Sequence, residues 1–284
     1  MATLLDLRRR IRSVKSTQQI TRAMKMVAAA RLRGAQERIF NARPYANQMQ
    51  ALLQSVTART EFRAHPLLAE RPVEKVLLVL VTADRGLCGA FNTNLTRAAQ
   101  NYFSEQADKQ VSVIAVGRKG RDYLHRRGTP PLSEHVGIFT RLQYKQAQAV
   151  AQQIVEAYST QAVDAVDFLY NEFKSILTQR VRVERYLPIK PLEPAAGEAL
   201  IDYLYEQPAA ELLNSLLPRY VETQVYRALL ESQAAELAAK MTAMDTATNN
   251  AAEMIDSLTL YMNRVRQAAI TREIIEVVSG AAAT

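Results

Sequence analysis

The sequence predicts a mixed α+β and α/β fold, in which an α/β domain is inserted between two long terminal helices that form an antiparallel coiled coil. Three observations predict it. The chain from Arg219 to Ser279 has neither glycine nor proline, residues 1–43 repeat apolar side chains with the same helical period, and strand patterns alternate with helix patterns between them. Two seams of one period at opposite ends of a chain pack most simply on each other.

The first expected element is an N-terminal coiled-coil helix over residues 1–58. Its only proline, Pro44, should at most kink it, because the amphipathic pattern continues beyond that residue. The seam residues are spaced alternately three and four apart, and their middle part is polar. They are Leu4, Leu7, Ile11, Val14, Gln18, Thr21, Lys25, Ala28, Leu32, Ala35 and Ile39.

Residues 73–190 predict the inserted α/β domain. Apolar runs mark strands at 75–82, 111–116, 166–170 and 181–187, and helical stretches fall at about 92–107, 118–127 and 141–160. This alternation is typical of a Rossmann-like layer with a mostly parallel sheet. The last two strands are joined by a connection too short for a helical crossover, so we expect them to be antiparallel. Val181, Val183 and Leu187 should share one face.

A proline-containing linker is expected over residues 191–208, and a long coiled-coil helix over 209–284. Pro208 and Pro218 should bracket the lead-in to this helix. At 1.5 Å per residue, the stretch without glycine or proline would be roughly 90 Å long, too long for its own small globule to bury. It should therefore project toward a partner. Its seam is Leu230, Ala234, Leu237, Met241, Met244, Thr248, Ala251, Ile255, Leu258, Met262, Val265 and Ala269.

The positive charge is concentrated at the N-terminus. The whole chain has a formal net charge of +8, and residues 1–43 hold eleven Lys or Arg against only Asp6 and Glu37. Such an arm needs an acidic partner. Charge alone leaves nucleic acid and an acidic protein surface equally open, although no nucleic-acid-binding motif is present.

A turn that follows the first strand and precedes a helix is the place where α/β folds bind phosphate. Neither nucleotide fingerprint is met there or elsewhere, and the three histidines lack metal-ligand spacing, so no cofactor or metal is expected. A structural turn with a buried thiol is favoured over catalysis by Cys88. A second glycine-containing turn, Gly117–Gly120, is a weaker candidate anion loop. The residues of the first turn are Asp84, Arg85, Gly86, Cys88 and Gly89.

No apolar stretch is long enough to span a membrane, and the N-terminus lacks the apolar core of a signal peptide. A mitochondrial presequence is disfavoured because the heptad positions continue far beyond one. The single cysteine, Cys88, excludes an internal disulfide and indicates a reducing compartment.

Several separated motifs resemble the γ-subunit family of F-type ATP synthases, and the resemblance covers essentially the whole chain. Ile270–Ala283 (ITREIIEVVSGAAA) matches each specified position of the signature ITxExxE followed by GA. The other matching segments are Ile11–Gln36, Asp84–Asn92 (DRGLCGAFN), Tyr170–Ser175 (YNEFKS) and Glu231–Ala251.

The resemblance implies a non-catalytic rotor shaft inside a ring of three α and three β subunits, with the globular domain and an ε subunit resting on the membrane c-ring. It implies that ion flow through the c-ring is coupled to ATP synthesis or hydrolysis on the β subunits, whose acidic loops would face the basic arm in place of nucleic acid. The implied contacts with β-subunit loops and the collar of the ring are Met24, Lys25, Arg266, Gln267, Thr271, Glu273, Val277 and Val278.

The chain departs from chloroplast members because residues 188–208 have no cysteine pair, so their regulatory disulfide is excluded. Because the chain also has no convincing presequence, we expect a bacterial protein, for which the resemblance implies a peripheral subunit at the cytoplasmic face of the inner or plasma membrane. Two alternatives remain: a basic coiled-coil protein that binds nucleic acid or acts as a scaffold, and an enzyme that uses Cys88.

Overall fold

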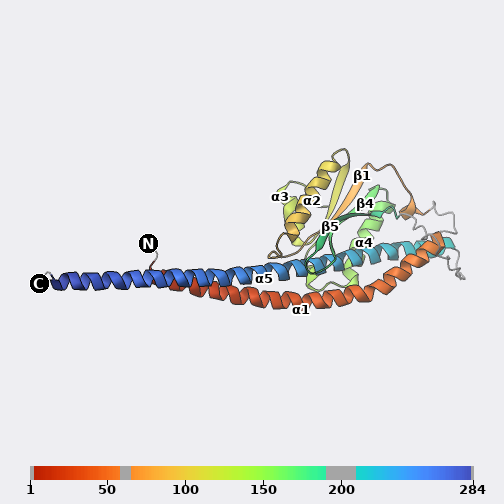
Figure 1. Cartoon of the computed structure of the whole chain (residues 1–284). Helices are drawn as coiled ribbons and strands as arrows, with labels where there is room; N and C mark the ends of the chain where they lie inside the picture. The colour runs from red at the N-terminus through yellow and green to blue at the C-terminus, as the bar shows by residue number, and fades with distance from the viewer. Residues whose placement is uncertain (1–2, 58–64, 190–208, 283–284) are drawn as a thin grey trace. The chain divides into compact units, whose positions relative to one another are not determined.

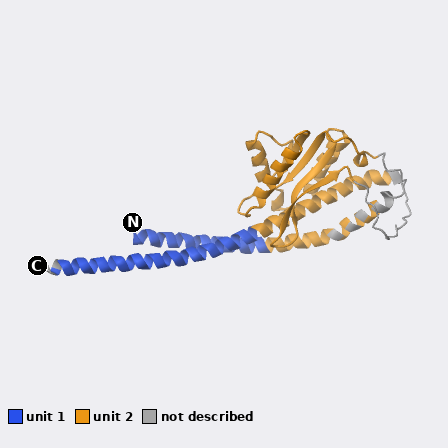
Figure 2. Ribbon diagram, turned by 45° about the horizontal axis from the view of Figure 1, so that its top comes forward, with its two compact units in different colours: residues 1–29, 240–284 blue, residues 30–239 orange. Residues whose placement is uncertain are grey.

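The computed structural model describes residues 3–57, 65–189 and 209–282. The chain divides into two compact units (Figure 2). We call residues 30–239 the body, and residues 1–29 with 240–284 the two-helix unit. The linker predicted at 191–208 lies outside the described residues.

Two long helices begin and end the chain (Figure 1). Helix α1 spans Leu4–Thr57 and continues through Pro44, as predicted. Helix α5 spans Ala209–Ala282, with Pro218 inside it. The expectation that Pro218 precedes the long helix was therefore wrong. Leu217 and Val221 on either side are almost fully buried, and this packing offsets the roughly 3 kcal/mol that a proline costs inside a helix.

The body is built on a five-stranded sheet with the order β3-β2-β1-β4-β5. The strands are β1 (Lys75–Val81), β2 (Gln110–Val116), β3 (Ser133–His135), β4 (Ala165–Phe173) and β5 (Gln179–Leu187). All neighbouring pairs are parallel except β4 and β5, which are antiparallel as predicted. The short strand β3 was not foreseen, since three residues carry too little periodicity to mark a strand.

Helices cover both faces of this sheet, which makes β1 a continuous apolar strand. Helices α2 (Phe91–Glu105) and α3 (Arg118–Arg126) pack on the face that carries Leu78 and Leu80. Helix α4 (Tyr144–Ser159) and parts of α1 and α5 pack on the opposite face. Two 3-10 turns, η2 (Pro66–Leu68) and η3 (Ile138–Thr140), complete the described elements.

Strand β5 does not present Val181, Val183 and Leu187 on one face, so that prediction was wrong. The pairing with β4 shifts register between Val166 and Asp167, where Leu187 and Arg185 are the partners and Tyr186 is left over. An extra residue of this kind reverses the alternation of side chains beyond it. Val181 accordingly packs with the α2 face, Leu187 packs with the α4 face, and Val183 is 47% exposed.

A buried polar group joins helix α2 to strands β4 and β5. The Asp167 carboxylate accepts two hydrogen bonds from Arg185, at 2.8 and 3.0 Å, and one from the Tyr102 hydroxyl at 2.6 Å. Burial, and then the hydrogen bond to Asp167, raise the pKa of Tyr102 far above its ordinary value, which keeps this hydroxyl a donor. The charge of Asp167 is therefore matched inside the body.

The described residues of the two-helix unit form no sheet, and their packing is the seam that the sequence predicts. Every predicted seam position of α1 from Leu4 to Ala28, and of α5 from Met241 to Ala269, is buried or half-buried. Side chains between these positions are mostly exposed. A seam of this width is typical of a coiled coil.

Candidate functional site

Two side-chain contacts fix the direction and register of α1 and α5 in the two-helix unit. The hydroxyls of Thr21 and Thr248 are hydrogen bonded at 2.8 Å, and Lys25 Nζ lies 2.6 Å from Asp245 Oδ1. A step forward in α1 is thus a step back in α5. The pairing is antiparallel, as predicted, and the polar middle of the seam is satisfied by contacts within the chain.

The register leaves the C-terminal end of α5 without a helical partner among the described residues. Equal steps from Thr21 toward the N-terminus and from Thr248 toward the C-terminus bring Leu4 level with Val265. Helix α1 begins at Leu4, whereas α5 continues to Ala282. Every residue from Thr271 to Ser279 is exposed.

This free end of α5 carries large apolar side chains. Val277 is 72% exposed and Val278 is 62% exposed, and three isoleucines nearby are about half exposed. On a helix with 3.6 residues per turn, positions 270, 274, 277 and 278 fall on one stripe about 100° wide, and Ile275 lies beside it. An exposed apolar stripe of this kind marks a surface that another molecule can cover. The isoleucines are Ile270, Ile274 and Ile275.

The predicted contact residues fall into two separate groups on the two-helix unit. Met24 and Lys25 are half-buried at the middle of the seam, and Lys25 is already paired with Asp245. The second group lies on α5, beginning about 30 Å further along the helix from Asp245. All of its members are exposed: Arg266, Gln267, Thr271, Glu273, Val277 and Val278.

Sequence reasoning missed a set of exposed apolar residues on the same unit. These large side chains occupy positions between the seam residues, where an amphipathic helix normally has polar residues. This departure from the pattern could have identified them in the sequence. On α5 the exposure of Leu260 reaches 62%. The set consists of Leu5, Ile20, Met26 and Val27 on α1, and Met254, Leu260 and Tyr261 on α5.

The basic residues of α1 form an exposed charged surface on this unit. Only Lys25 among them has an ion pair that the described residues show, and the other six are exposed. These six are Arg8, Arg9, Arg10, Arg12, Lys15 and Arg22. The arrangement can bind an acidic surface, but it offers no group positioned for covalent or acid–base chemistry.

The turn after β1 in the body is held by hydrogen bonds within the chain. The Asp84 carboxylate accepts the backbone N–H groups of Arg118 at 3.1 Å and Gly137 at 2.9 Å, so it ties together the loops that follow three neighbouring strands. Gly89 has a φ of 55°, in the left-handed region. Gly86 and Arg85 complete the predicted turn, and Arg85 is exposed.

Cys88 is only 2% exposed, and its sulfur accepts a hydrogen bond from Asn92 Nδ2 at 3.1 Å. A thiol must be reachable to act as a nucleophile on an external substrate. The geometry therefore favours a structural role for the turn from Asp84 to Gly89.

The second candidate turn, Gly117–Gly120, does not offer free N–H groups to an anion. The N–H of Arg118 is used by Asp84, that of Lys119 by the Ala83 carbonyl at 3.1 Å, and that of Gly120 by Thr82 Oγ1 at 2.7 Å. An anion at a helix N-terminus needs these donors. The anion-loop interpretation is therefore disfavoured.

Within residues 3–57, 65–189 and 209–282, no cluster of three His, Cys, Asp or Glu side chains could hold a metal ion. In the same part of the chain, no helix is both long and apolar enough to cross a membrane.

The matching family model and two of the most similar sequences point to the same family. A family model described as ATP synthase matches residues 3–284. The ATP synthase gamma chain of Solibacter usitatus is 52% identical over 287 residues, which cover 100% of this chain and 99% of the relative. The gamma chain of Desulfitobacterium hafniense is 49% identical over 284 residues, with 100% and 99% coverage.

Solved structures of similar fold come from rotary assemblies. A chain in the central stalk and c-ring structure of the Tetrahymena thermophila mitochondrial ATP synthase is 27% identical, with a TM-score of 0.62 over 80% of this chain and 99% of its own. A chain of the Euglena gracilis mitochondrial ATP synthase has a TM-score of 0.70 over 99% of this chain and 94% of its own. Its sequence identity is 19%, so it supports the fold alone.

Proposed function

Because the chain belongs to the family of ATP synthase γ chains, we propose that it is the central rotor stalk of an F-type ATP synthase. The two-helix unit turns inside a ring of three α and three β subunits. The body, together with an ε subunit, rests on the membrane c-ring. Rotation driven by ion flow through the c-ring then moves the catalytic sites of the β subunits through different conformations, and hydrolysis drives the reverse rotation.

The observation that carries this proposal is the exposed apolar end of α5. Ile274, Val277 and Val278 lie on one exposed stripe of the helix, with no cover from the described residues. Burial of such side chains stabilises by about 25 cal/mol per Å² of apolar area. The apolar collar of a surrounding ring of subunits would supply that burial along the stripe.

The charges of α1 suit the same arrangement. Acidic loops on the β subunits would attract the basic surface formed by residues such as Arg8, Arg12 and Lys15, since each of these is exposed. Lys25 has a ready partner in Asp245, at 2.6 Å, so an acidic loop would have to compete with this pair as the stalk turns. Met24, Arg266, Gln267, Thr271 and Glu273 would complete the contacts.

In this role the chain performs no bond chemistry. The stalk acts by binding the β subunits differently at each angle, and only such a difference in binding free energy can shift their conformational equilibrium. The chain would lie at the cytoplasmic face of a bacterial inner or plasma membrane as a peripheral subunit.

Reconstitution tests the proposal directly. The full chain is mixed with α and β subunits of the Solibacter usitatus enzyme, and the complex is isolated and observed in a single-molecule rotation assay with ATP. A stable complex of three α, three β and one copy of this chain, with ATP-driven rotation, is the expected result. Recovery of the chain on DNA or RNA, with no α or β subunit bound, would refute it.

Truncation then tests the role of the end of α5. A chain that ends at Glu276 lacks Val277, Val278 and the residues after them, and it should assemble but rotate with reduced torque. The matched control is Glu253→Gln on the same helix, an exposed position outside the proposed contacts. Equal torque for the truncated and full chains would exclude a contribution from these residues.

A further inference from the structure

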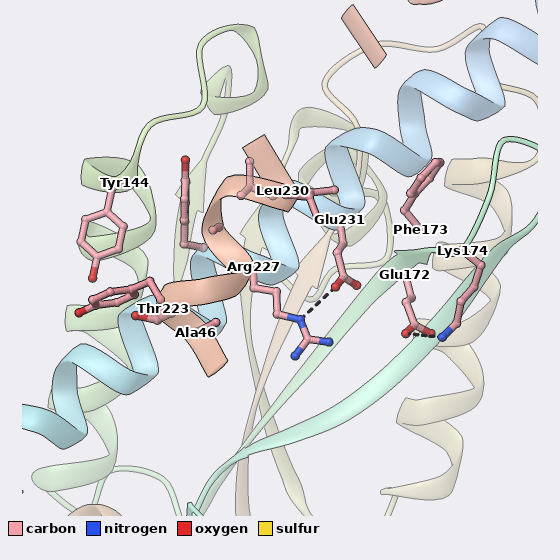
Figure 3. A pocket seen from close by; sticks show the side chains of 13 residues that line it. Ala46, Tyr144, Glu172, Phe173, Lys174, Thr223, Arg227, Leu230 and Glu231 are labelled. Carbon is pink, nitrogen blue, oxygen red and sulfur yellow. Dashed lines mark hydrogen bonds and ion pairs between the residues drawn. The ribbon is translucent and has the colours of Figure 1, made fainter. Parts of the chain in front are cut away.

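The body contains a cavity of about 490 Å³ that the proposed rotor function does not use. It lies between α1, the end of β4, the start of α4, and α5 (Figure 3). Small-molecule sites in proteins fall between about 300 and 1,000 Å³. The size of the cavity is therefore that of a ligand site.

Aromatic side chains from four elements line this cavity. Tyr45 comes from α1, Phe173 from β4, Tyr144 from α4 and Tyr226 from α5. The rings of Tyr144 and Tyr226 meet edge to face with their centroids 5.5 Å apart. Rings set at such angles offer both faces and edges to a further aromatic ring.

One carboxylate in the wall has an unused oxygen. Glu231 is 8% exposed, and its Oε1 accepts a hydrogen bond from Arg227 Nε at 3.0 Å. Its Oε2 is buried and has no hydrogen-bond partner among the described residues. Burial raises the pKa of the Glu231 carboxyl, and Arg227 opposes this only in part. A buried acceptor without a donor is unfavourable, so a donor placed there is stabilising.

The second carboxylate in the wall is satisfied. Glu172 lies 2.9 Å from Lys174 Nζ and 3.3 Å from Arg182 Nη1. The two cations that line the cavity, Lys174 and Arg227, equal its two carboxylates, Glu172 and Glu231, in number. An added ammonium group is therefore disfavoured, whereas an uncharged donor can reach Glu231 without increasing the positive charge.

We propose that this cavity binds a small uncharged aromatic molecule with one hydroxyl or N–H donor, of the phenol or indole class. The ring packs among Tyr45, Tyr144, Phe173 and Tyr226, and the donor hydrogen bonds to Glu231 Oε2. A hydrogen bond to an ionised carboxylate is about twice as strong as a neutral one. Because α1 and α5 both line the cavity, the ligand also links residues 39–46 of α1 to the rest of the body.

Paired probes test the donor. Binding of 4-ethylphenol and of 4-ethylanisole, which has the same ring without the donor, is measured by ligand-observed NMR on the full chain. The phenol should bind with a Kd on the order of 0.1–1 mM, and the ether roughly tenfold more weakly. No binding of the phenol, or equal affinity for the two probes, would overturn the proposal. Tighter binding of phenethylamine or 3-phenylpropionate would overturn the ligand class.

Variants of the chain locate the site. Glu231→Leu should abolish the preference for the phenol and leave the affinity for the ether unchanged, a result that a purely structural role of Glu231 does not give. Ala46→Phe should fill the cavity and weaken the binding of both probes. Circular dichroism checks that this variant folds. Glu253→Leu, a change at an exposed position on the same helix, should alter the affinity for neither probe. A preference for the phenol that survives Glu231→Leu would show that the donor binds elsewhere.

Discussion

The body and the two-helix unit bury their apolar side chains to different extents. In the body, every residue of β1 from Val76 to Val81 is completely buried, because helices cover both faces of the sheet. In the two-helix unit, one narrow seam is buried, while Leu260 and Val277 remain more than half exposed. The body thus has a closed core, although single side chains such as Leu177 and Leu132 are exposed on its surface, whereas the two-helix unit buries only a seam.

Because of this difference, we expect substitutions in the two regions to affect different properties, folding in one and assembly in the other. Substitutions in the core of the body should act on folding, since its side chains pack on one another and most of its buried polar groups have partners within the chain. Substitutions at the free end of α5 should leave folding unchanged and act on assembly. The two classes can be distinguished by measuring the free energy of unfolding and the assembly of the same variants.

The largest effect on folding is expected for Gly117→Ala in the body. Gly117 has a φ of 93°, and a Cβ there would lie 2.1 Å from the backbone oxygen of Thr82. The left-handed conformation and the clash together should cost about 3–5 kcal/mol. Urea unfolding followed by circular dichroism measures this loss.

Gly34→Ala is the matched control, because Gly34 lies inside α1 and a Cβ there meets nothing within 4 Å. This change should stabilise the chain by about 0.5–1 kcal/mol, since alanine favours a helix over glycine. Similar unfolding curves for the two variants would contradict the close packing of the loop after β2 against β1.

A smaller effect is expected for Asp164→Asn, at the start of β4 in the body. The carboxylate accepts the N–H of Lys75 at 2.9 Å and that of Glu74 at 3.2 Å. The hydrogen bond from Lys75 contributes most to lowering the pKa of Asp164 below its usual 3.8. At pH 7 the change should cost about 1 kcal/mol, a value reduced by the access of solvent to the group.

The pH dependence of this difference has a defined sign. A carboxyl group whose pKa is lower in the folded chain stabilises fully above its unfolded pKa, and the contribution disappears as the pH falls through the folded value. The variant and the original chain should therefore differ at pH 7, and the difference should shrink as the pH falls below 3.8. A difference that is constant from pH 7 to pH 3 would contradict an ionic role.

The strong periodic patterns made most of the fold predictable. The seams from Leu4 to Ala28 and from Met241 to Ala269 follow from residue spacing alone, and the apolar run of β1 marks a strand buried on both faces. The face of β5 was missed because the extra residue at Tyr186 depends on pairing with β4, which spacing within one strand does not record. Strand β3 and the helical course through Pro218 also depend on tertiary packing.

The candidate site was less predictable than the fold. Lys25 could be placed on the polar part of a seam, but its ion pair with Asp245 depends on the register of two helices distant in sequence. Residues from four elements line the cavity beside Glu231, so no local sequence motif predicts it. Site residues on separate elements leave no spacing signal when the elements meet only in the fold.

The Lys25–Asp245 pair should contribute less than either change in the body. Both side chains are nearly half exposed, at 40% and 47%, and exposed ion pairs typically contribute about 0.2–1 kcal/mol. A double-mutant cycle with Lys25→Ala and Asp245→Ala measures the coupling energy by urea unfolding. The coupling should shrink at high salt. A coupling above about 2 kcal/mol would place this pair among the strong contacts of the molecule and weaken the contrast between the two regions.

The smallest effect on folding is expected at the free end of α5. Ile274→Ser and Ile275→Ser replace side chains that are 57% and 58% exposed, so the free energy of unfolding should change by no more than about 0.5 kcal/mol. A variant that carries both substitutions should assemble less tightly with α and β subunits, because it lacks apolar area that the surrounding subunits would cover. Size-exclusion chromatography of the mixed subunits measures the assembly, with Glu253→Gln as the exposed control on the same helix. Loss of folding stability without loss of assembly would reverse the distinction between the two regions, since it would mean that these isoleucines are packed within the chain.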